Sequence, residues 1–297
     1  EISIFIILPI FCLLQFKEDW LSWITVLSLC LLLALYVVQL KIGVNNEFRF
    51  LSLLFFQSLI LNLGSFFQPL RDSEHWRQNQ NAFAAKIIGD EGINFLNPLP
   101  VFGINSTVPM ELPILQNLSG FLQMIGIKEN ITLRPVAWLV YILFVFFSYK
   151  LILNLSGEKV AEMVVVFFVF TPILYKYSNS YMIEFLPHLF GVLSLNMILN
   201  NKKIAPIFLS LSLLSKITTG VIYLSLFACI LIFRNKEKLI KTFYVLSVAV
   251  IPYIVWNIYS DFKKSQNSLT SWLTSQNLFT YNFGTTEQYQ NLEIYRK

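Results

Sequence analysis

Long apolar runs separated by short polar connectors make up most of the chain. Most runs are long enough to cross roughly 30 Å of hydrocarbon, and a chain inside lipid has to be helical because its backbone groups find no water there. The pattern therefore predicts an all-α polytopic membrane protein with about nine transmembrane helices. We place these spans at residues 2–16, 20–40, 49–69, 133–155, 160–177, 181–199, 204–218, 219–233 and 242–259.

The composition supports a membrane protein. Hydrophobic residues make up 56% of the 297 residues and charged residues only 13%, whereas soluble domains carry roughly 25% charged residues. The formal net charge of +5 comes mostly from basic residues in short connectors, which is typical of membrane orientation and not of nucleic-acid binding. We therefore expect membrane lipids, and no nucleic acid, among the partners.

The basic connectors predict the orientation, because all of them fall on one side when the spans are counted, and that side should be cytoplasmic. They contain Lys41, Arg49, Lys150, Lys159, Lys202, Lys203, Arg234, Lys236, Lys238 and Lys241. The extracytoplasmic side then holds the long loop at 70–132, a turn at 176–181, a tight turn near Thr218–Gly220 and the tail from Asp261. We expect 260–297 to begin a later outer loop, and 1–297 to be a single transmembrane domain that is a fragment of a longer protein.

The long outer loop carries two helical patterns of its own. One covers Ala82–Ile88. Between the two patterns, the stretch NFLNPLPVFG has two prolines and a glycine, which predicts a turn-rich connector. The second pattern predicts an amphipathic helix lying on the membrane. Its apolar positions are Ile114, Leu115, Leu118, Phe121, Leu122 and Ile125.

The polar stretch RDSEHWRQ opens the same loop, directly after an apolar run. A carboxylate held at the membrane boundary can act as a general base on a hydroxyl or an amine. Asp72 and Glu74 are the candidates, and His75, Trp76 and Gln78 are the neighbours expected to support them. The alternative is an ordinary juxtamembrane charge cluster that fixes the end of a helix.

Three further polar residues lie near the predicted outer ends of spans. Glu184 and His188 are four residues apart and share one helical face, where charge next to hydrocarbon is rarely without a partner. Lys216 lies near the end of another span, where a phosphate would be a natural partner for its ammonium. The alternatives are that Lys216 reaches to the lipid headgroups and that His188 packs or makes a hydrogen bond. Two histidines are too few for a convincing histidine metal site.

An ordered set of motifs extends this pattern over residues 49 to 290. It consists of DSEHWRQ, NFLNPLP, ELP with Glu111, Arg134 at the start of a span, TPILYKYSNSYMIEFLPHLFG and LLSKITTG. Together they resemble the GT-C membrane glycosyltransferases. More narrowly, they are similar to the family 39-like branch, which is related to the dolichyl-phosphate-mannose–protein mannosyltransferases and to the aminoarabinose transferase of lipid A. The resemblance implies a GT-C-like helical bundle with a helical first extracytoplasmic loop.

The resemblance also implies an activity and residue roles. By position, Asp72 matches the family's catalytic base, with Glu74 in reserve. The acceptor would attack the anomeric carbon of a sugar and expel a polyprenyl monophosphate with inversion, and Arg77 and Lys216 would bind the phosphate. Glu111, Arg134, Glu184 and His188 would line the pocket or support the loop. No cofactor is required by this chemistry, although some GT-C enzymes use a divalent cation.

One part of the sequence departs from the pattern of the family. Relatives often carry a Thr-Asp or similar pair after the WRQ-like stretch, whereas this chain has amides at Asn79, Gln80 and Asn81.

A polytopic transporter or flippase of lipid-linked saccharides could also place polar residues near the membrane, but it should show repeats and broken helices near the middle of the membrane. The acceptor, whether a lipid, a glycan or a protein, and the sugar itself are not specified by these motifs. We expect the protein in a bacterial cell membrane with its active site on the extracytoplasmic face.

Overall fold

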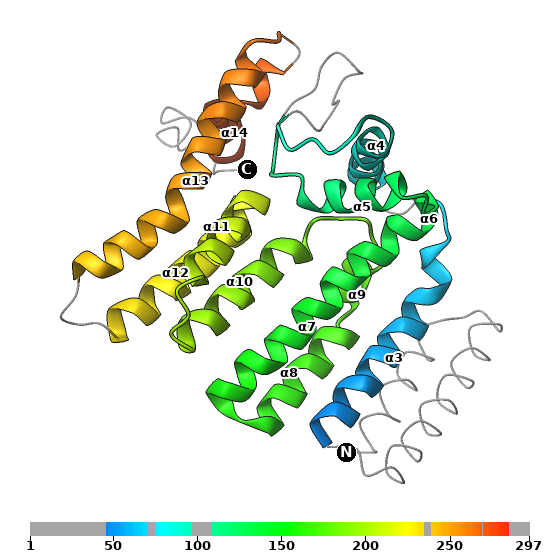
Figure 1. Ribbon diagram of the computed structural model, residues 1–297, viewed down its shortest axis with the longest axis vertical. Coiled ribbons are helices and arrows are strands. Elements are labelled where there is room, and N and C mark those ends of the chain that lie inside the picture. The colour runs from blue at the N-terminus through cyan, green and yellow to red at the C-terminus, as the bar shows by residue number, and fades with distance from the viewer. Residues whose placement is uncertain (1–45, 71–74, 97–108, 235–238, 269, 285–297) are drawn as a thin grey trace, which may run out of the picture.

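The computed structural model describes residues 46–70, 75–96, 109–234, 239–268 and 270–284 (Figure 1). In this part of the chain every secondary-structure element is a helix, which confirms the predicted all-α class there. The predicted spans at 2–16 and 20–40 lie outside the described residues. The helices are α3 (Asn46–Phe66), α4 (His75–Glu91), α5 (Ile114–Met124), α6 (Glu129–Thr132), α7 (Arg134–Ser156), α8 (Glu158–Phe170), α9 (Pro172–Ser178), α10 (Phe185–Leu199), α11 (Ala205–Ser215), α12 (Ile217–Arg234), α13 (Leu239–Ser265) and α14 (Ser275–Phe283), with a 3-10 turn η1 at Ser271–Leu273.

Three helical segments are long and apolar enough to cross a membrane, namely Glu47–Phe66, Glu129–Ser156 and Val245–Ser265. Helices α8 and α9 form a fourth span if they count as one, and α10, α11 and α12 are apolar but shorter. Helix α11, for example, has 11 residues and is therefore about 16 Å long, against roughly 30 Å of hydrocarbon. Apolar helices that can span a membrane are thus present, while seven full-length spans between residues 46 and 284 are not found among the described residues.

The predicted span at 160–177 is bent by 66° between α8 and α9, so that it is either one broken span or a re-entrant pair of helices. Thr171 at the break has extended backbone, and the ring of Pro172 removes the N–H that would continue the helix of α8. The Thr171 hydroxyl donates to the Phe167 carbonyl at 2.6 Å. Proline and threonine together therefore end α8 and start a new helix axis.

The break predicted near Thr218–Gly220 lies two residues earlier, at Lys216. Residues 218–220 belong to α12, and the chain turns at Lys216, whose backbone is extended between α11 and α12. Gly220 has a packing role here, because a Cβ on it would come within 2.7 Å of the Leu213 Cα in α11. The glycine that suggested a turn in the sequence therefore allows two helices to pack closely.

The described part of the tail from Asp261 is largely helical. Helix α13 continues to Ser265, with Pro252 inside it, and α14 follows after the short turn η1. The carboxylate of Asp261 accepts the backbone N–H of Ser275 at 3.0 Å, at the start of α14. The C-terminal end of α13 is thus tied to the next helix, while residues 285–297 of the predicted loop lie outside the described residues.

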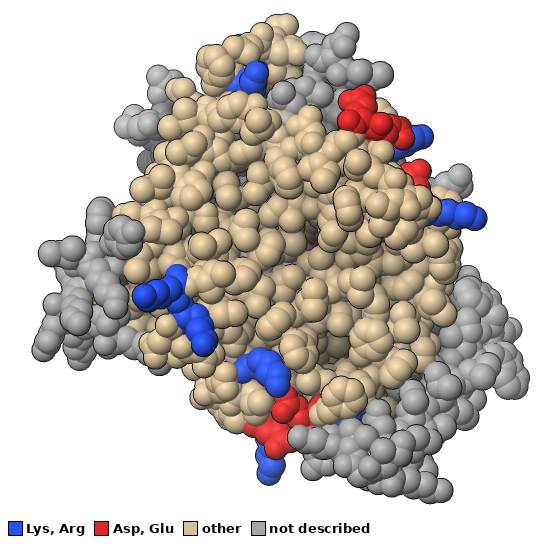
Figure 2. Space-filling model, viewed as in Figure 1, with Lys and Arg blue, Asp and Glu red and all other residues tan. Residues whose placement is uncertain are grey.

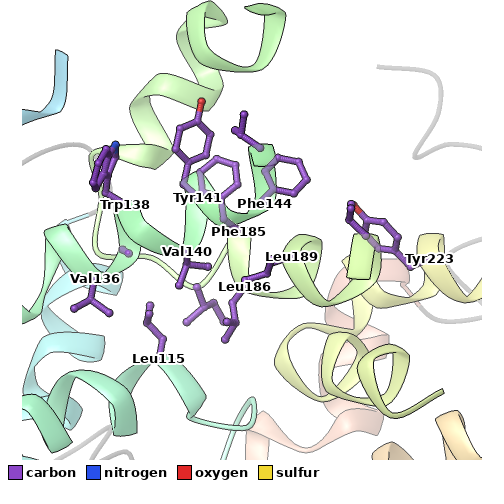
Figure 3. Packing of buried hydrophobic residues seen from close by; sticks show 14 of the residues in the cluster. Leu115, Val136, Trp138, Val140, Tyr141, Phe144, Phe185, Leu186, Leu189 and Tyr223 are labelled. Carbon is purple, nitrogen blue, oxygen red and sulfur yellow. The ribbon is translucent and has the colours of Figure 1, made fainter. Parts of the chain in front are cut away.

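Helix α7 lies at the centre of the bundle and packs against α10, α8 and α3. Its aromatic residues Tyr141 and Phe144 are buried against Phe185 of α10 (Figure 3). Because lipid is as apolar as such a core, helices in a membrane are held mainly by packing and by hydrogen bonds between them. Bonds of this kind include those from the Trp138 indole to the Ser58 hydroxyl at 3.0 Å and from the Tyr141 phenol to the Phe168 carbonyl at 3.0 Å.

The two ends of the bundle differ. Helices α4 and α5 and the end of α13 lie at one end, and the turn between α7 and α8 lies at the other (Figure 1). The visible face between the ends is largely uncharged, and its charged side chains gather toward the ends (Figure 2). At the α7–α8 end, Lys150 pairs with Glu47 at 2.5 Å. We call the end with α4 and α5 the loop end.

Candidate functional site

Helix α5 at the loop end exposes part of its apolar side, while Leu115 is buried and Ile114 and Leu122 pack against the core. The residues that it buries include Gln116, Asn117 and Ser119, whereas Leu118 and Phe121 are each 44% exposed. A soluble helix would show the opposite arrangement, and a face of this kind is stable where it meets lipid. The predicted amphipathic helix is therefore present, with the apolar side chains of Leu118, Phe121 and Ile125 exposed, and contact of these residues with lipid stays a prediction.

Helix α4 begins at His75 and so includes the end of the polar stretch that opens the loop. It packs tightly on α5, because Gly120 of α5 faces α4 so closely that a Cβ there would lie 2.5 Å from Ile88 Cγ2 and 2.8 Å from the Ala85 carbonyl oxygen. The sequence pattern indicated only Ala82–Ile88 of this helix. The first turn was missed because its polar residues carry no apolar periodicity.

Three buried amides hold α4 and α5 to the turn that precedes α10. Gln78 Oε1 accepts the backbone N–H of Tyr181 at 2.9 Å, and Asn81 donates to the Tyr181 carbonyl at 3.4 Å. Gln116 of α5 donates to Asn81 Oδ1 at 3.0 Å. Asn81, one of the three amides that follow the WRQ stretch, thus bonds the backbone of this turn. Gln78 was predicted to support the site, and it is completely buried in this network.

Arg77 pairs with Glu111, with Nη2 2.5 Å from Oε1. Both side chains are about one quarter exposed, at 23% and 25%, so that the pair is neither fully solvated nor fully desolvated. Arg77 Nη1 also lies 3.5 Å from Gln80 Oε1. Two residues that are 34 apart in the chain, and that the sequence motifs assign to the same pocket, therefore contact each other directly.

Residues 109–112, which include Glu111, form a strap across the loop end. The Leu112 N–H donates to the Leu214 carbonyl of α11 at 2.9 Å. The Trp256 indole of α13 donates to the Met110 carbonyl at 2.9 Å, and the Ser260 hydroxyl donates to the Pro109 carbonyl at 2.5 Å. The strap thus joins α4, α11 and α13.

A second ion pair lies where α10 starts and α11 ends. Lys216 Nζ donates to Glu184 Oε2, with the two side chains 32% and 24% exposed. One turn along α10, His188 Nδ1 lies 3.0 Å from the Tyr223 hydroxyl of α12. The histidine has a hydrogen-bonding and packing role here, as its alternative interpretation stated, since its ring also contacts Phe144 and Tyr223 at centroid distances of 5.6 and 5.7 Å.

The two ion pairs lie on either side of the bond from Leu112 to Leu214. Glu111 precedes Leu112, and Lys216 follows Leu214 by two residues. The structure therefore brings Arg77, Glu111, Glu184 and Lys216 to one end of the bundle. Both cations that the resemblance assigns to a phosphate are paired with carboxylates, so an incoming phosphate would compete with Glu111 and Glu184 for them.

The other predicted site residues have varied positions. Asp72 and Glu74 lie outside the described residues. Arg134 is 3% exposed and donates to the Ser65 and Pro69 carbonyls at 2.9 and 3.3 Å, so that it joins the start of α7 to the end of α3. His75 is exposed, and Trp76 is 66% exposed. Arg134 therefore has a structural role, whereas neither aromatic ring is enclosed by the described residues.

One further charged residue, Lys264, is buried at the loop end of α13. The sequence pattern gave no reason to single it out, because it lies in an ordinary basic pair, Lys263 and Lys264, just beyond a predicted span. Consecutive residues of a helix point in different directions. The two lysines could therefore have been told apart from the sequence only if the helix had been expected to continue past Asp261.

A metal centre is not formed by the residues that the structure describes. Between residues 46 and 284, apart from the gaps, no group of three His, Cys, Asp or Glu side chains could hold a metal ion. Asp72 and Glu74 lie within one of those gaps. The expectation concerning a divalent cation at the predicted base therefore stays a prediction.

Comparison of the chain with known proteins finds no matching family model, no matching curated protein and no matching solved structure. The resemblance to GT-C glycosyltransferases is thus carried by the short motifs alone. The chemistry of the loop end has to be inferred from its own residues and contacts.

Proposed function

We propose that the protein is an inverting glycosyltransferase that moves a sugar from a polyprenyl-phosphate donor to an acceptor at the extracytoplasmic membrane face. The observation that carries the proposal is the meeting of two cation–carboxylate pairs, Arg77–Glu111 and Lys216–Glu184, at one end of a bundle of apolar helices. Partly buried ionisable groups beside hydrocarbon are a functional-site hypothesis by default. Their position suits a substrate whose charge sits at the membrane surface and whose tail sits in lipid.

The reaction would use these groups in the following way. The acceptor hydroxyl or amine loses its proton to Asp72 as its oxygen or nitrogen bonds to the anomeric carbon. The bond from that carbon to the phosphate oxygen breaks, and the electron pair leaves with the polyprenyl phosphate. Charge therefore grows on the phosphate in the transition state, where a fixed guanidinium and a fixed ammonium stabilise it more than they stabilise the donor.

The strap and the buried amides would keep these groups in position. Arg77 and Gln78 are neighbours on α4, and Gln78 fixes α4 to the turn that leads into Glu184. Glu111 is held by strap bonds to α11 and α13. A catalytic group that is held by such contacts already has a fixed orientation before the substrate binds. This favours a defined geometry of attack.

A transporter or flippase of lipid-linked saccharides is the second candidate. Two breaks favour it, because the α8–α9 bend of 66° and the extended Lys216 between α11 and α12 interrupt apolar helices as transporters often do. Against it, both described ion pairs of the site lie at the loop end and none of the site's charged residues lies in the middle of a described helix.

Reconstitution of the full-length protein in vesicles with a panel of polyprenyl-phosphate sugars distinguishes the two functions. A transferase releases polyprenyl phosphate and moves the labelled sugar to an acceptor, with inverted anomeric configuration in the product. A flippase moves the intact donor between leaflets and releases nothing. Donor movement without any release, across the whole panel, would contradict the proposal and favour the second candidate.

A further inference from the structure

Two buried amide atoms at the contact between α4 and α5 have no hydrogen-bond partner among the described residues. One is the donor Nε2 of Gln80, and the other is the acceptor Oε1 of Gln116, a residue that is 3% exposed. Burial of a polar atom without a partner is costly. Because nearly all buried polar atoms in folded proteins are paired, these two atoms indicate a place where another molecule can supply the missing bonds.

The contacts that α4 makes with the strap and with α5 follow the same order along both segments. Arg77 contacts Glu111, which is 34 residues later. Gln116 donates to Asn81 at 3.0 Å, across 35 residues, and Gly120 packs on the next turn of α4. The nearly constant offset places the Arg77–Glu111 contact and the Asn81–Gln116 contact one turn of α4 apart.

Gln80 lies between these two contacts. It shares one face of α4 with Arg77 and Asn81, because residues at i, i+3 and i+4 of a helix are neighbours on its surface. Its Oε1 lies 3.5 Å from Arg77 Nη1, and Gln116 bonds to the adjacent Asn81. Arg77, Gln80 and the bond to Gln116 therefore fall within one turn of α4, which rises about 5.4 Å.

This polar face runs from the surface of the loop end into its interior. The Arg77 and Glu111 side chains are 23% and 25% exposed, whereas Gln116 is buried. A ligand whose charged group contacts Arg77 would thus have its next few atoms beside the two amides.

The two atoms without partners select a chemical class of ligand, because one is a donor and the other an acceptor. A phosphate group presents mainly acceptors, and a metal ion would bind the amide oxygen but not the N–H group, so that neither satisfies both atoms. A hydroxyl group both donates and accepts a hydrogen bond. A ring that carries several hydroxyls, which is to say a sugar, meets both needs.

We propose that Gln80 and Gln116 bind hydroxyl groups of the sugar of the polyprenyl-phosphate donor. This inference rests on the proposed function, which assigns the donor phosphate to Arg77 and Lys216, and it adds the residues that recognise the sugar. A site that hydrogen-bonds a hydroxyl discriminates against a ligand that lacks it, because the buried amide is then left without a partner. The two amides are thus specificity-determining residues and take no part in the bond exchange.

Binding of a polyprenyl-phosphate sugar, compared with polyprenyl monophosphate of equal length, isolates the contribution of the sugar. Both ligands are titrated into full-length protein in nanodiscs, and the ratio of their dissociation constants is the readout, with the tightest-binding sugar of the panel. The wild type should prefer the sugar-bearing ligand. Gln80→Met and Gln116→Met should each reduce that preference by about threefold to tenfold, the effect of one lost hydrogen bond.

Gln123→Met is the matched control. It removes the same amide from α5 about two turns after Gln116, where Gln123 Nε2 donates to the Thr132 hydroxyl at 2.9 Å, and its sugar preference should equal that of the wild type. If Gln116→Met does not fold, because it also loses the bond to Asn81, Gln80→Met still tests the site. Without ligand, Gln80→Met should unfold at nearly the wild-type temperature, because the Nε2 atom that it removes bonds to no described residue.

The failure of this inference is distinguishable from the failure of the proposed function, because release of polyprenyl phosphate is measured separately. If the wild type releases it and folded Gln80→Met and Gln116→Met keep the full sugar preference, the amides do not bind the sugar, while the transferase remains. If no donor is turned over but the preference falls in both variants, the sugar site stands and the transferase fails. A wild type without any sugar preference, or an equal fall in Gln123→Met, overturns the sugar site.

Discussion

Tyr223 Oη lies 3.0 Å from His188 Nδ1, and the Tyr223 ring fills the space that a side chain on Gly191 would need. Gly191 is three residues after His188 on α10. Because Gly191 has no side chain, the Tyr223 ring can lie close enough to α10 for its hydroxyl to make the hydrogen bond with His188, one turn after Glu184. We predict that Gly191→Ala displaces the ring, breaks this bond and destabilises the protein by about 1–3 kcal/mol. Thermal unfolding in detergent would measure the loss.

Gly64→Ala is the control for this substitution. Gly64 lies inside α3, and a Cβ added to it would have no neighbouring heavy atom within 4 Å, so alanine there should be neutral or should stabilise the helix by roughly 0.5–1 kcal/mol. Equal destabilisation by both substitutions would contradict the packing explanation for Gly191.

The buried amide network predicts a specific role for Gln78. Its Oε1 accepts the backbone N–H of Tyr181, and Gln78→Met would leave that buried donor without its acceptor at a cost of about 1–3 kcal/mol. Asn79→Ala, one residue further at an exposed position, should change the unfolding temperature little. A Gln78→Met variant as stable as Asn79→Ala would show that the bond to Tyr181 does not hold α4 in place.

The outward apolar face of α5 predicts lipid contact. Single cysteines at Phe121 and at exposed Lys86 of α4, in a chain without its native cysteines, can be labelled in vesicles with a water-soluble maleimide. The cysteine at residue 121 should react several-fold more slowly than the one at residue 86, because its face is covered by lipid. The same difference in labelling rate is expected in lipid nanodiscs. Equal labelling rates at residues 121 and 86, in vesicles and in nanodiscs, would contradict a helix at the membrane surface.

Sequence and structure agree where the signal is local. Apolar runs alone were enough for the helical class, and residues at helical spacing located α5 to within one residue of its ends. The turn at Lys216 was predicted two residues too late, and the contact of Gly220 with Leu213 depends on tertiary packing that the sequence does not show. The bend at Thr171–Pro172 had a local signal in its proline, which the apolar run around it outweighed.

The candidate site was only partly accessible to sequence reasoning. Glu111 and Arg77 could be assigned to one pocket through the motifs, but not to one ion pair, because the pairing joins α4 to a strap 34 residues later. Lys264 carries no local signal at all, since its burial depends on α13 continuing past Asp261.

The Lys216–Glu184 pair predicts a defect in donor use. Lys216→Ala should raise the KM for a polyprenyl-phosphate sugar by about tenfold or more, because one charge-assisted contact to phosphate is lost. Lys216→Arg should bring the KM most of the way back to the wild-type value. Lys202→Ala, at an exposed lysine near the other end of the bundle, should leave the KM unchanged. A Lys216→Ala enzyme with the wild-type KM would indicate that Lys216 only balances the charge of Glu184.

The most direct test of the proposed transferase is release of polyprenyl phosphate from a polyprenyl-phosphate sugar by the full-length protein, with Asp72→Asn compared with Asp90→Asn. Both variants remove one carboxylate in or just before α4 in the chain, but only Asp72 is the proposed base. We predict turnover by the wild type and by Asp90→Asn, and a loss of at least about a hundredfold in Asp72→Asn, as expected when a general base is removed. Turnover that survives in Asp72→Asn would contradict the assigned base, and its absence in the wild type with every donor would contradict the glycosyltransferase itself.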